Sequence, residues 1–301
     1  MSAPVILVDA AATVSTTAKR ARKRLTSPIA SIVVIVLAVL WTIPTFGLFV
    51  TSFREPADIL TNGWWNAFAD PSFTLDNYRT VLEAQTSGYS LVDAFVNSLV
   101  ITIPSVLVPV AFALLAAYAF AWTSFRGRDF LFVLVFALQV VPVQVTLVPL
   151  LNVFSGAGLT GTFWPVWISH AIFSLPLATF LLHNFMRDIP GELIDSARVD
   201  GANHAQVFLR VIVPLMTPAI AAFAIFQFLW VWNDLLVALT FASSPSTNPM
   251  TVALANLAGS RGNAWYLLSA GAFVSMIVPL IVFLSMQRYF VRGLLAGSVK
   301  G

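Results

Sequence analysis

The sequence predicts an all-α polytopic membrane protein with six transmembrane helices. Hydrophobic residues make up 58% of the 301 residues and charged residues only 10%, and the mean hydropathy is +0.87. A soluble globular domain has about 25% charged residues. Apolar runs that reach the roughly 20 helical residues needed to cross a hydrocarbon core recur along the chain, and the charged residues gather between them. These three observations favour a bundle of membrane-spanning helices.

Six apolar runs divide the chain. The first run is longer than the roughly 7 to 15 residues of a signal-peptide core and has no small-x-small cleavage site after it, so we expect it to remain as a span. The spans are expected at about 28–52, 92–122, 130–152, 163–185, 217–240 and 266–290. They define a transmembrane domain over 28–290 with a polar loop at 186–216, a basic and disordered tail at 1–27, and a C-terminal tail at 291–301.

The basic residues predict the orientation of these spans. Thirteen of the sixteen lysines and arginines lie in the two tails, in the loop near residue 126 and in the loop at 186–216. Only Arg54, Arg79 and Arg261 lie on the other side. Because lysine and arginine concentrate in cytoplasmic loops, both termini and the loop at 186–216 are expected in the cytoplasm. Topology therefore explains the net charge of +3 better than nucleic acid does, and the basic tail is expected to contact anionic lipid.

Several kinds of chemistry are excluded or disfavoured by the residues present. The chain has no cysteine, so it has neither a disulfide nor a thiol nucleophile. It has no Gly-x-x-x-x-Gly-Lys motif, so it lacks a phosphate-binding loop of that kind. His170, His183 and His204 lack metal-ligand spacing, and a histidine inside a span is usually an interhelical hydrogen-bond partner. No paired carboxylates or nucleophile and base are discernible.

Proline is frequent inside the predicted spans. Each such residue removes a backbone hydrogen bond and bends or breaks its helix. Bent helices suit a translocation path that changes shape better than they suit a static anchor. The prolines concerned are Pro104, Pro109, Pro142, Pro149, Pro165, Pro176 and Pro279.

The polar loop at 186–216 has the pattern of an ordered docking element. Pro190 can open a short helix and Asp200-Gly201 can end it, because glycine tolerates the left-handed conformation of a helix end. A second helix is expected from about residue 202 until Pro214 and Pro218 interrupt it. The small and apolar side chains available to fill a partner's groove are Leu193, Ala197, Ala202 and Phe208. The alternative is a surface loop that binds nothing.

The spacing in this loop resembles the EAA loop of ABC importer permeases. That pattern is Glu-Ala-Ala, three residues, Gly, nine residues, and Ile-x-Leu-Pro. The corresponding positions here are Asp195, Ser196, Ala197, Gly201, Val211, Val213 and Pro214. Further stretches, from about residue 28 to the end, resemble the maltose-type carbohydrate permeases, in particular the shorter six-span member of the permease pair. They are Asn97-Ser98-Leu99, Ala117-Tyr118-Ala119-Phe120, the run 142–149, Phe173-Ser174-Leu175-Pro176 and Trp232-Asn233-Asp234.

The resemblance implies a type I ABC importer permease fold in a bacterial or archaeal cell membrane. It also implies a sister permease chain, two ATPase subunits that bind ATP and magnesium, and an extracytoplasmic solute-binding protein. This chain would then be a transport subunit, not an enzyme, with neither a cofactor nor a metal of its own. The residues expected to couple to the ATPases are Asp195, Ser196, Ala197, Asp200, Gly201, Ala202, Phe208 and Pro214.

A second group of residues is expected to line the translocation pathway. Asp234 is an acidic residue placed inside a predicted span, where a charge indicates either function or a hydrogen-bond network with Asn233 and Gln227. Aromatic faces and directed polar groups can hold sugars, but they also suit helix packing. In the family the sugar site lies mainly on the sister chain, so the resemblance implies pathway lining only. The candidates are Gln139, Gln144, Trp230, Trp232, Asn233 and Asp234.

Together these features predict the permease subunit of an ATP-driven sugar importer, with a disaccharide or oligosaccharide as solute. The spans lack a cluster of basic residues, which disfavours a phosphorylated solute. The alternative is a secondary carrier driven by an ion gradient, which would require several buried ionisable residues and an internal repeat. A membrane anchor that recruits a cytoplasmic partner would not need bent spans.

Overall fold

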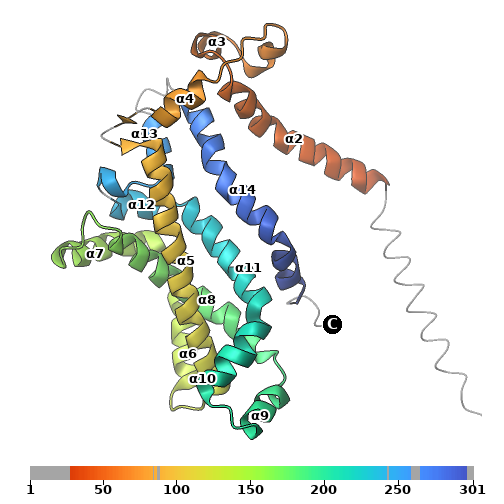
Figure 1. The fold of residues 1–301 in the computed structure, drawn as a ribbon, viewed down its shortest axis with the longest axis vertical. Helices are drawn as coiled ribbons and strands as arrows, with labels where there is room; N and C mark the ends of the chain where they lie inside the picture. Colours follow the sequence, from red (N-terminus) through yellow and green to blue (C-terminus); the bar gives the residue numbers. More distant parts are fainter. Residues whose placement is uncertain (1–27, 84, 87–88, 243, 259–264, 297–301) are drawn as a thin grey trace, which may run out of the picture. The chain divides into compact units, whose positions relative to one another are not determined.

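The computed structural model (Figure 1) describes residues 28–83, 85–86, 89–242, 244–258 and 265–296. Almost all of these residues are helical, which confirms the predicted all-α class. The only strands among them are β1 (Gln85–Thr86) and β2 (Tyr89–Ser90), which pair antiparallel. The basic tail at 1–27 and the last residues of the C-terminal tail lie outside the described residues. The chain forms two units, residues 1–74 and residues 75–301.

The first unit contains α2 (Pro28–Ser52), α3 (Pro56–Thr61) and the 3₁₀ helix η1 (Trp64–Phe68). Arg54 is buried and holds the turn after α3, because its Nη1 donates to the carbonyl oxygens of Asn62 (3.2 Å) and Gly63 (3.0 Å). The absence of a side chain at Gly47 makes room for the Trp64 ring, since a Cβ there would lie 2.7 Å from the indole nitrogen. The segment that follows the first apolar helix is therefore folded against the end of α2.

The second unit is built around long helices. These are α5 (Leu91–Trp122), α8 (Trp164–Arg187), α11 (Val213–Trp232) and α14 (Trp265–Ala296), the last of which reaches into the predicted C-terminal tail. The shorter elements are α4 (Asp76–Glu83), α6 (Arg128–Ala137), η2 (Leu138–Val140), α7 (Val143–Gly156), α9 (Gly191–Val199), α10 (His204–Val207), η3 (Phe208–Ile212), α12 (Leu236–Phe241), η4 (Pro245–Thr247) and α13 (Met250–Ala258). Helix α5 packs along α8 and α11, and α11 also packs along α14.

Small side chains allow α5, α8 and α11 to approach one another closely. Ala113, Ala117 and Ala178 are fully buried, and they belong to one apolar cluster with Leu182 and Phe223. Membrane helices pack through small residues in this way because lipid offers no hydrophobic gain for their association. The same cluster continues into the segment that contains α9 and α10.

The apolar run expected to span 130–152 is broken in the structure. Helix α6, extended by η2, ends before Pro142, and α7 begins after it at an angle of 99°. Val141 is extended (φ −70°, ψ 119°), as the residue before a proline tends to be. Within the described residues, five helices are long and apolar enough to cross a membrane, or six if the bent pair counts as one span. The break lies at Pro142, one of the prolines expected to bend or break its helix, and the span expected at 130–152 corresponds to this bent pair.

The fifth apolar run also differs from the expectation of a span at 217–240. Helix continues from His204 to Trp232, and α12 is a separate short helix. Pro214 does not interrupt the helix as expected, because η3 is a π-helical turn in which the Val213 N–H bonds to the carbonyl of Phe208. Such a turn contains one residue more than an α-helical turn, and this gives the proline ring room. The second half of the polar loop, from His204 on, and α11 therefore form one continuous helix.

Three prolines form joints between helices, which we call the proline joints. A proline has no N–H, so the carbonyl four residues before it loses its helical partner. In this bundle a side chain of a neighbouring helix donates to that carbonyl instead. The bonds are Trp167 Nε1 to Val100 O (2.9 Å) before Pro104, Gln227 Nε2 to Ser105 O (3.2 Å) before Pro109, and Trp232 Nε1 to Ser275 O (3.2 Å) before Pro279. They link α8 to α5, α11 to α5, and α11 to α14.

Candidate functional site

The segment that contains α9 and α10, residues 190–207, has the bent form predicted for a docking element, and we call it the knuckle. It lies at the lower end of Figure 1, beyond the end of α8. Helix α9 begins after Pro190 and ends at Asp200. The turn is made by Gly201, whose φ of +82° lies in the left-handed region that favours glycine.

Hydrogen bonds fix the turn after α9. The Gly201 N–H donates to the carbonyl of Arg198 (3.0 Å), and the Ala202 N–H donates to the carbonyl of Ala197 (2.9 Å). These are the two bonds of a Schellman helix end, which satisfies carbonyls that the helix leaves unpaired. The predicted helix stop at Asp200-Gly201 therefore lies where the sequence placed it.

A capping box starts the second helix of the knuckle. The Asn203 side chain accepts from the Gln206 N–H (2.9 Å), and the Gln206 side chain accepts from the Asn203 N–H (2.9 Å). The helix consequently starts at His204, two residues later than expected. The spacing of Asn203 and Gln206 is a capping signature that the sequence reasoning missed. The Schellman end of α9 and the capping box of α10 lie within a few residues of each other, and together they make the knuckle rigid.

The inner face of the knuckle packs against the membrane helices. Ile194 and Val207 are fully buried in the apolar cluster, and Ala197, Ala202 and Phe208 are partly buried against it. These last three, which were expected to fill a partner's groove, place part of their surface against this chain's own core and so help to anchor the knuckle.

Tyr118 of α5 connects that helix to the end of the knuckle through a polar contact and a ring contact. The Tyr118 hydroxyl lies 2.9 Å from His204 Nδ1, within hydrogen-bond distance, and the Tyr118 ring meets the Phe208 ring edge to face with centroids 5.3 Å apart. Because α10 continues through η3 into α11, the knuckle is connected to two helices of the bundle at once.

The outer face of the knuckle is exposed and carries both charge and apolar surface. Val199 is 87% exposed, and Leu193 is also exposed. Of the predicted coupling residues, those on this face are Asp195, Ser196, Asp200 and Gly201, while Pro214 is exposed on α11. Val199 was not among the sequence candidates, although a valine between Arg198 and Asp200 is an apolar residue in a polar stretch. The outer face is a surface suited to contact with a partner.

A cavity of about 220 Å³ lies at the level of the break between α6 and α7. Two of the predicted pathway residues, Gln139 and Trp230, line it together with Ser174 and Gln227, and its other lining residues are apolar. Gln139 lies in η2, just before the break at Pro142, and lines the cavity together with residues of α8 and α11. No charged side chain lines the cavity.

Asp234 lies between α11 and α12 and not inside a helix. Its Oδ2 accepts from the Ala238 N–H (3.1 Å) and lies 3.9 Å from His170 Nε2. The Thr251 hydroxyl donates to the Asp234 carbonyl (2.7 Å). His170 is buried, and its ring stands edge-on to Trp230 with centroids 5.3 Å apart. The carboxylate therefore caps the start of α12 and lies close to His170 of α8.

The remaining pathway candidates lie elsewhere. Trp232 is buried, and its indole N–H takes part in the proline joint between α11 and α14. Gln144 is exposed. Asn233 donates to the carbonyl of Leu229 in its own helix (2.7 Å), and Gln227 belongs to a proline joint. The expected network of Asp234 with Asn233 and Gln227 is therefore not the arrangement found.

A bundle of bent apolar helices that surrounds an uncharged cavity and carries a rigid knuckle at one end has the architecture of a membrane transport subunit. No group of three potential metal-ligating side chains occurs in the part of the chain that the structure describes. Residues 109–295 match the family described as binding-protein-dependent transport system inner membrane component, so the chain belongs to this family of ABC importer permeases. It is a transport subunit of the membrane, not an enzyme.

Relatives and a solved structure agree with this assignment. The chain is 53% identical over 274 residues to the osmoprotective compounds uptake permease protein GgtD of Synechocystis sp., covering 89% of this chain and 91% of the relative. It is 49% identical over 244 residues to the alpha-glucoside transport system permease protein AglG of Rhizobium meliloti, covering 79% of this chain and 63% of the relative. A bacterial ABC transporter involved in alginate import has the same fold, with a TM-score of 0.71, 20% identity, and coverage of 89% of this chain and 98% of that chain.

Proposed function

We propose that this chain forms half of the translocation pathway of an ATP-driven sugar importer and couples to its ATPases through the outer face of the knuckle. Its partners would be a sister permease chain, two ATPase subunits that bind ATP and magnesium, and an extracytoplasmic solute-binding protein. The observation that carries the proposal is the knuckle itself, whose ends are fixed by hydrogen bonds while Val199 and its neighbours stay exposed. In a bacterial or archaeal cell membrane, the knuckle and both termini would face the cytoplasm.

The connections of the knuckle suggest how a movement would reach the cavity. A displacement of the outer face moves α10 and, through the continuous helix, α11. Gln227 and Trp230 lie on α11 and line the cavity, so their positions would follow. Docking that differs between two states of the ATPases would bias the bundle between outward and inward openings.

The proposed solute is a neutral disaccharide with an α-linked glucose. Its neutrality is supported by the cavity, where Gln139, Ser174 and Gln227 provide uncharged polar groups and Trp230 provides an aromatic face. The sugar class is supported by the names of the relatives, which transport alpha-glucosides in one case and osmoprotective compounds in the other. Competition between sugars for uptake tests this choice. The family depends on a binding protein, so an ion-gradient-driven carrier is not favoured.

A substitution on the outer face tests the coupling role. Val199→Glu adds charge to an exposed apolar contact without disturbing the buried inner face, whereas Val199→Thr keeps the shape and adds only a hydroxyl. We expect ATPase subunits to co-purify from solubilised membranes with the native chain and the threonine variant, and to be lost with the glutamate variant. Co-purification that is equal for all three would show that the ATPases dock elsewhere.

A further inference from the structure

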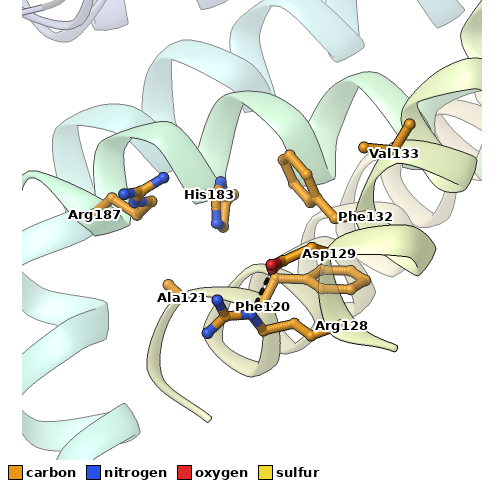
Figure 2. A pocket seen from close by; sticks show the side chains of 8 residues that line it. All are labelled: Phe120, Ala121, Arg128, Asp129, Phe132, Val133, His183 and Arg187. Atoms are coloured by element: carbon orange, nitrogen blue, oxygen red, sulfur yellow. Dashed lines mark hydrogen bonds and ion pairs between the residues drawn. The ribbon is translucent and has the colours of Figure 1, made fainter. Parts of the chain in front are cut away.

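A second cavity, of about 470 Å³, lies where the ends of α5, α6 and α8 meet, and we call it the basic pocket (Figure 2). Arg187 and His183 line it from α8, Arg128 and Asp129 from the start of α6, and Phe120 from the end of α5. Arg187 is the last residue of α8, and the knuckle follows after a short turn. The pocket therefore lies at the same end of the bundle as the knuckle.

The charged groups of the pocket leave donors available. Arg128 Nε is bonded to Asp129 Oδ1 at 2.9 Å, and the Asp129 carboxylate is 87% exposed at the pocket edge. Arg187 has no acidic partner among the described residues. Two guanidinium groups and one carboxylate line the pocket, so it keeps a net positive charge. The amino end of α6 adds the positive end of a helix dipole.

A buried histidine provides an independent sign of a missing ligand. The His183 side chain is 7% exposed, and its Nδ1 has no hydrogen-bond partner. Its ring lies against Phe132, with centroids 4.3 Å apart. A buried polar atom without a partner is unfavourable, and the ring that carries this atom lines the cavity together with two arginines. A ligand that accepts hydrogen bonds would satisfy it.

The wall of the pocket beside the bundle is apolar. Phe132 contacts Phe120 and Phe180, and Phe136 lies against Phe180 with centroids 4.5 Å apart. Val133, on the adjoining face of α6, is 63% exposed. An apolar surface thus runs from the basic pocket along a membrane helix.

We propose that the basic pocket binds the phosphate group of an anionic membrane lipid. Arg187 and Arg128 would donate to the phosphate oxygens, a geometry that the planar guanidinium suits, and His183 would complete the set. One acyl chain would lie along Phe132 and Val133. A basic pocket between helices that continues into an exposed apolar surface fits a lipid better than it fits a free anion. The bound lipid would stiffen the junction between α8 and the knuckle.

Lipid retention by the assembled importer tests the proposal. The complex is reconstituted in nanodiscs with equal amounts of phosphatidylglycerol and phosphatidylcholine and extracted into detergent, and the lipids that remain bound are counted by native mass spectrometry. We expect phosphatidylglycerol to be retained preferentially. Arg187→Gln and Arg128→Gln should each weaken its retention about fivefold, the effect of about one basic contact at a membrane surface.

Matched controls separate the alternatives. Arg126→Gln removes the same charge from the same loop but outside the pocket, so retention should be unchanged. Adding inorganic phosphate to the extracted complex should not displace the lipid, whereas displacement would mean that a free anion is the ligand. Retention that is equal in Arg187→Gln and Arg126→Gln overturns the proposal. If Arg187→Gln does not assemble, the native complex still decides, because equal retention of both lipids also overturns it.

Discussion

The turn at Gly201 provides a sharp test of how the knuckle couples the bundle to its partners. Replacing Gly201 by valine places a β-branched side chain at a φ of +82°. Apart from the two neighbouring residues, no atom lies within 4 Å of the Cβ that would be added, so the space around this position is open. The effect of the substitution on the free chain must therefore come from the backbone. Gly201→Asn is the matched control, because asparagine adopts the left-handed conformation more readily than other residues.

The chain can accommodate valine in two ways, and both give a similar free-energy cost for the turn. If valine keeps the left-handed conformation, the strain is about 1–2 kcal/mol. If the turn refolds to avoid the strain, it loses the bonds from the Gly201 and Ala202 N–H groups, each worth about 1 kcal/mol. Either route disfavours the native turn by up to about 2 kcal/mol, which is roughly a 30-fold change in its equilibrium. The buried helices do not depend on this turn, so membrane insertion should be unaffected.

Proteoliposomes with the complete importer allow uptake and ATP hydrolysis to be measured together. We expect Gly201→Val to hydrolyse ATP while its uptake falls about tenfold, within the range set by the strain, and Gly201→Asn to remain near the native level. Normal uptake by Gly201→Val would refute the reasoning. Equal losses in both variants would refute it differently, since they would mean that any side chain at this position blocks the docking surface, whatever its backbone preference.

Two further predictions concern the bundle and its solute. Gln227→Leu leaves the buried Ser105 carbonyl without a donor, so it should destabilise the purified complex by about 1–3 kcal/mol and lower its melting temperature. A second substitution, Pro109→Ala, supplies a backbone N–H to the same carbonyl and should recover part of the lost stability. No recovery would contradict the role of this joint. Uptake of a labelled α-linked glucose disaccharide should be competed by unlabelled disaccharides and not by a sugar phosphate, because the cavity lining holds no charge; equal competition by the phosphate would argue against a neutral solute.

Much of the fold can be predicted from hydropathy, because burial in lipid requires long apolar helices whatever their packing. The direction that the chain takes after a proline is harder to predict. The break at Pro142 and the continuous helix through Pro214 both involve a proline in an apolar run, yet one chain segment turns by 99° and the other does not. The difference depends on the π-helical turn before Pro214, which has no signal in a hydropathy profile. Interpreting a proline as a helix break is therefore correct at Pro142 and wrong at Pro214.

The knuckle was predictable in outline because its stop signal is local. Glycine after Asp200 indicates a left-handed helix end from the sequence alone, and the Asn203 capping box would have placed the next helix start as well. Which side chains of the knuckle face the helix bundle could not be predicted in the same way. Ala197 and Phe208 turn inward because Ile194 and Val207 pack on the bundle, and that depends on how the whole knuckle rests against α5 and α8.

The proline joints have a consequence for how this chain can change over generations. In each joint the acceptor is a main-chain carbonyl, which any residue type provides, so the positions that hold Val100, Ser105 and Ser275 can vary freely as far as the joint is concerned. The proline and its donor cannot vary independently. A chain that loses the proline regains the helical hydrogen bond and leaves the side-chain donor without a partner. A chain that loses the donor leaves the carbonyl without a partner. Across related chains, each proline and its tryptophan or glutamine should therefore be gained and lost together, as a covarying pair on two different helices.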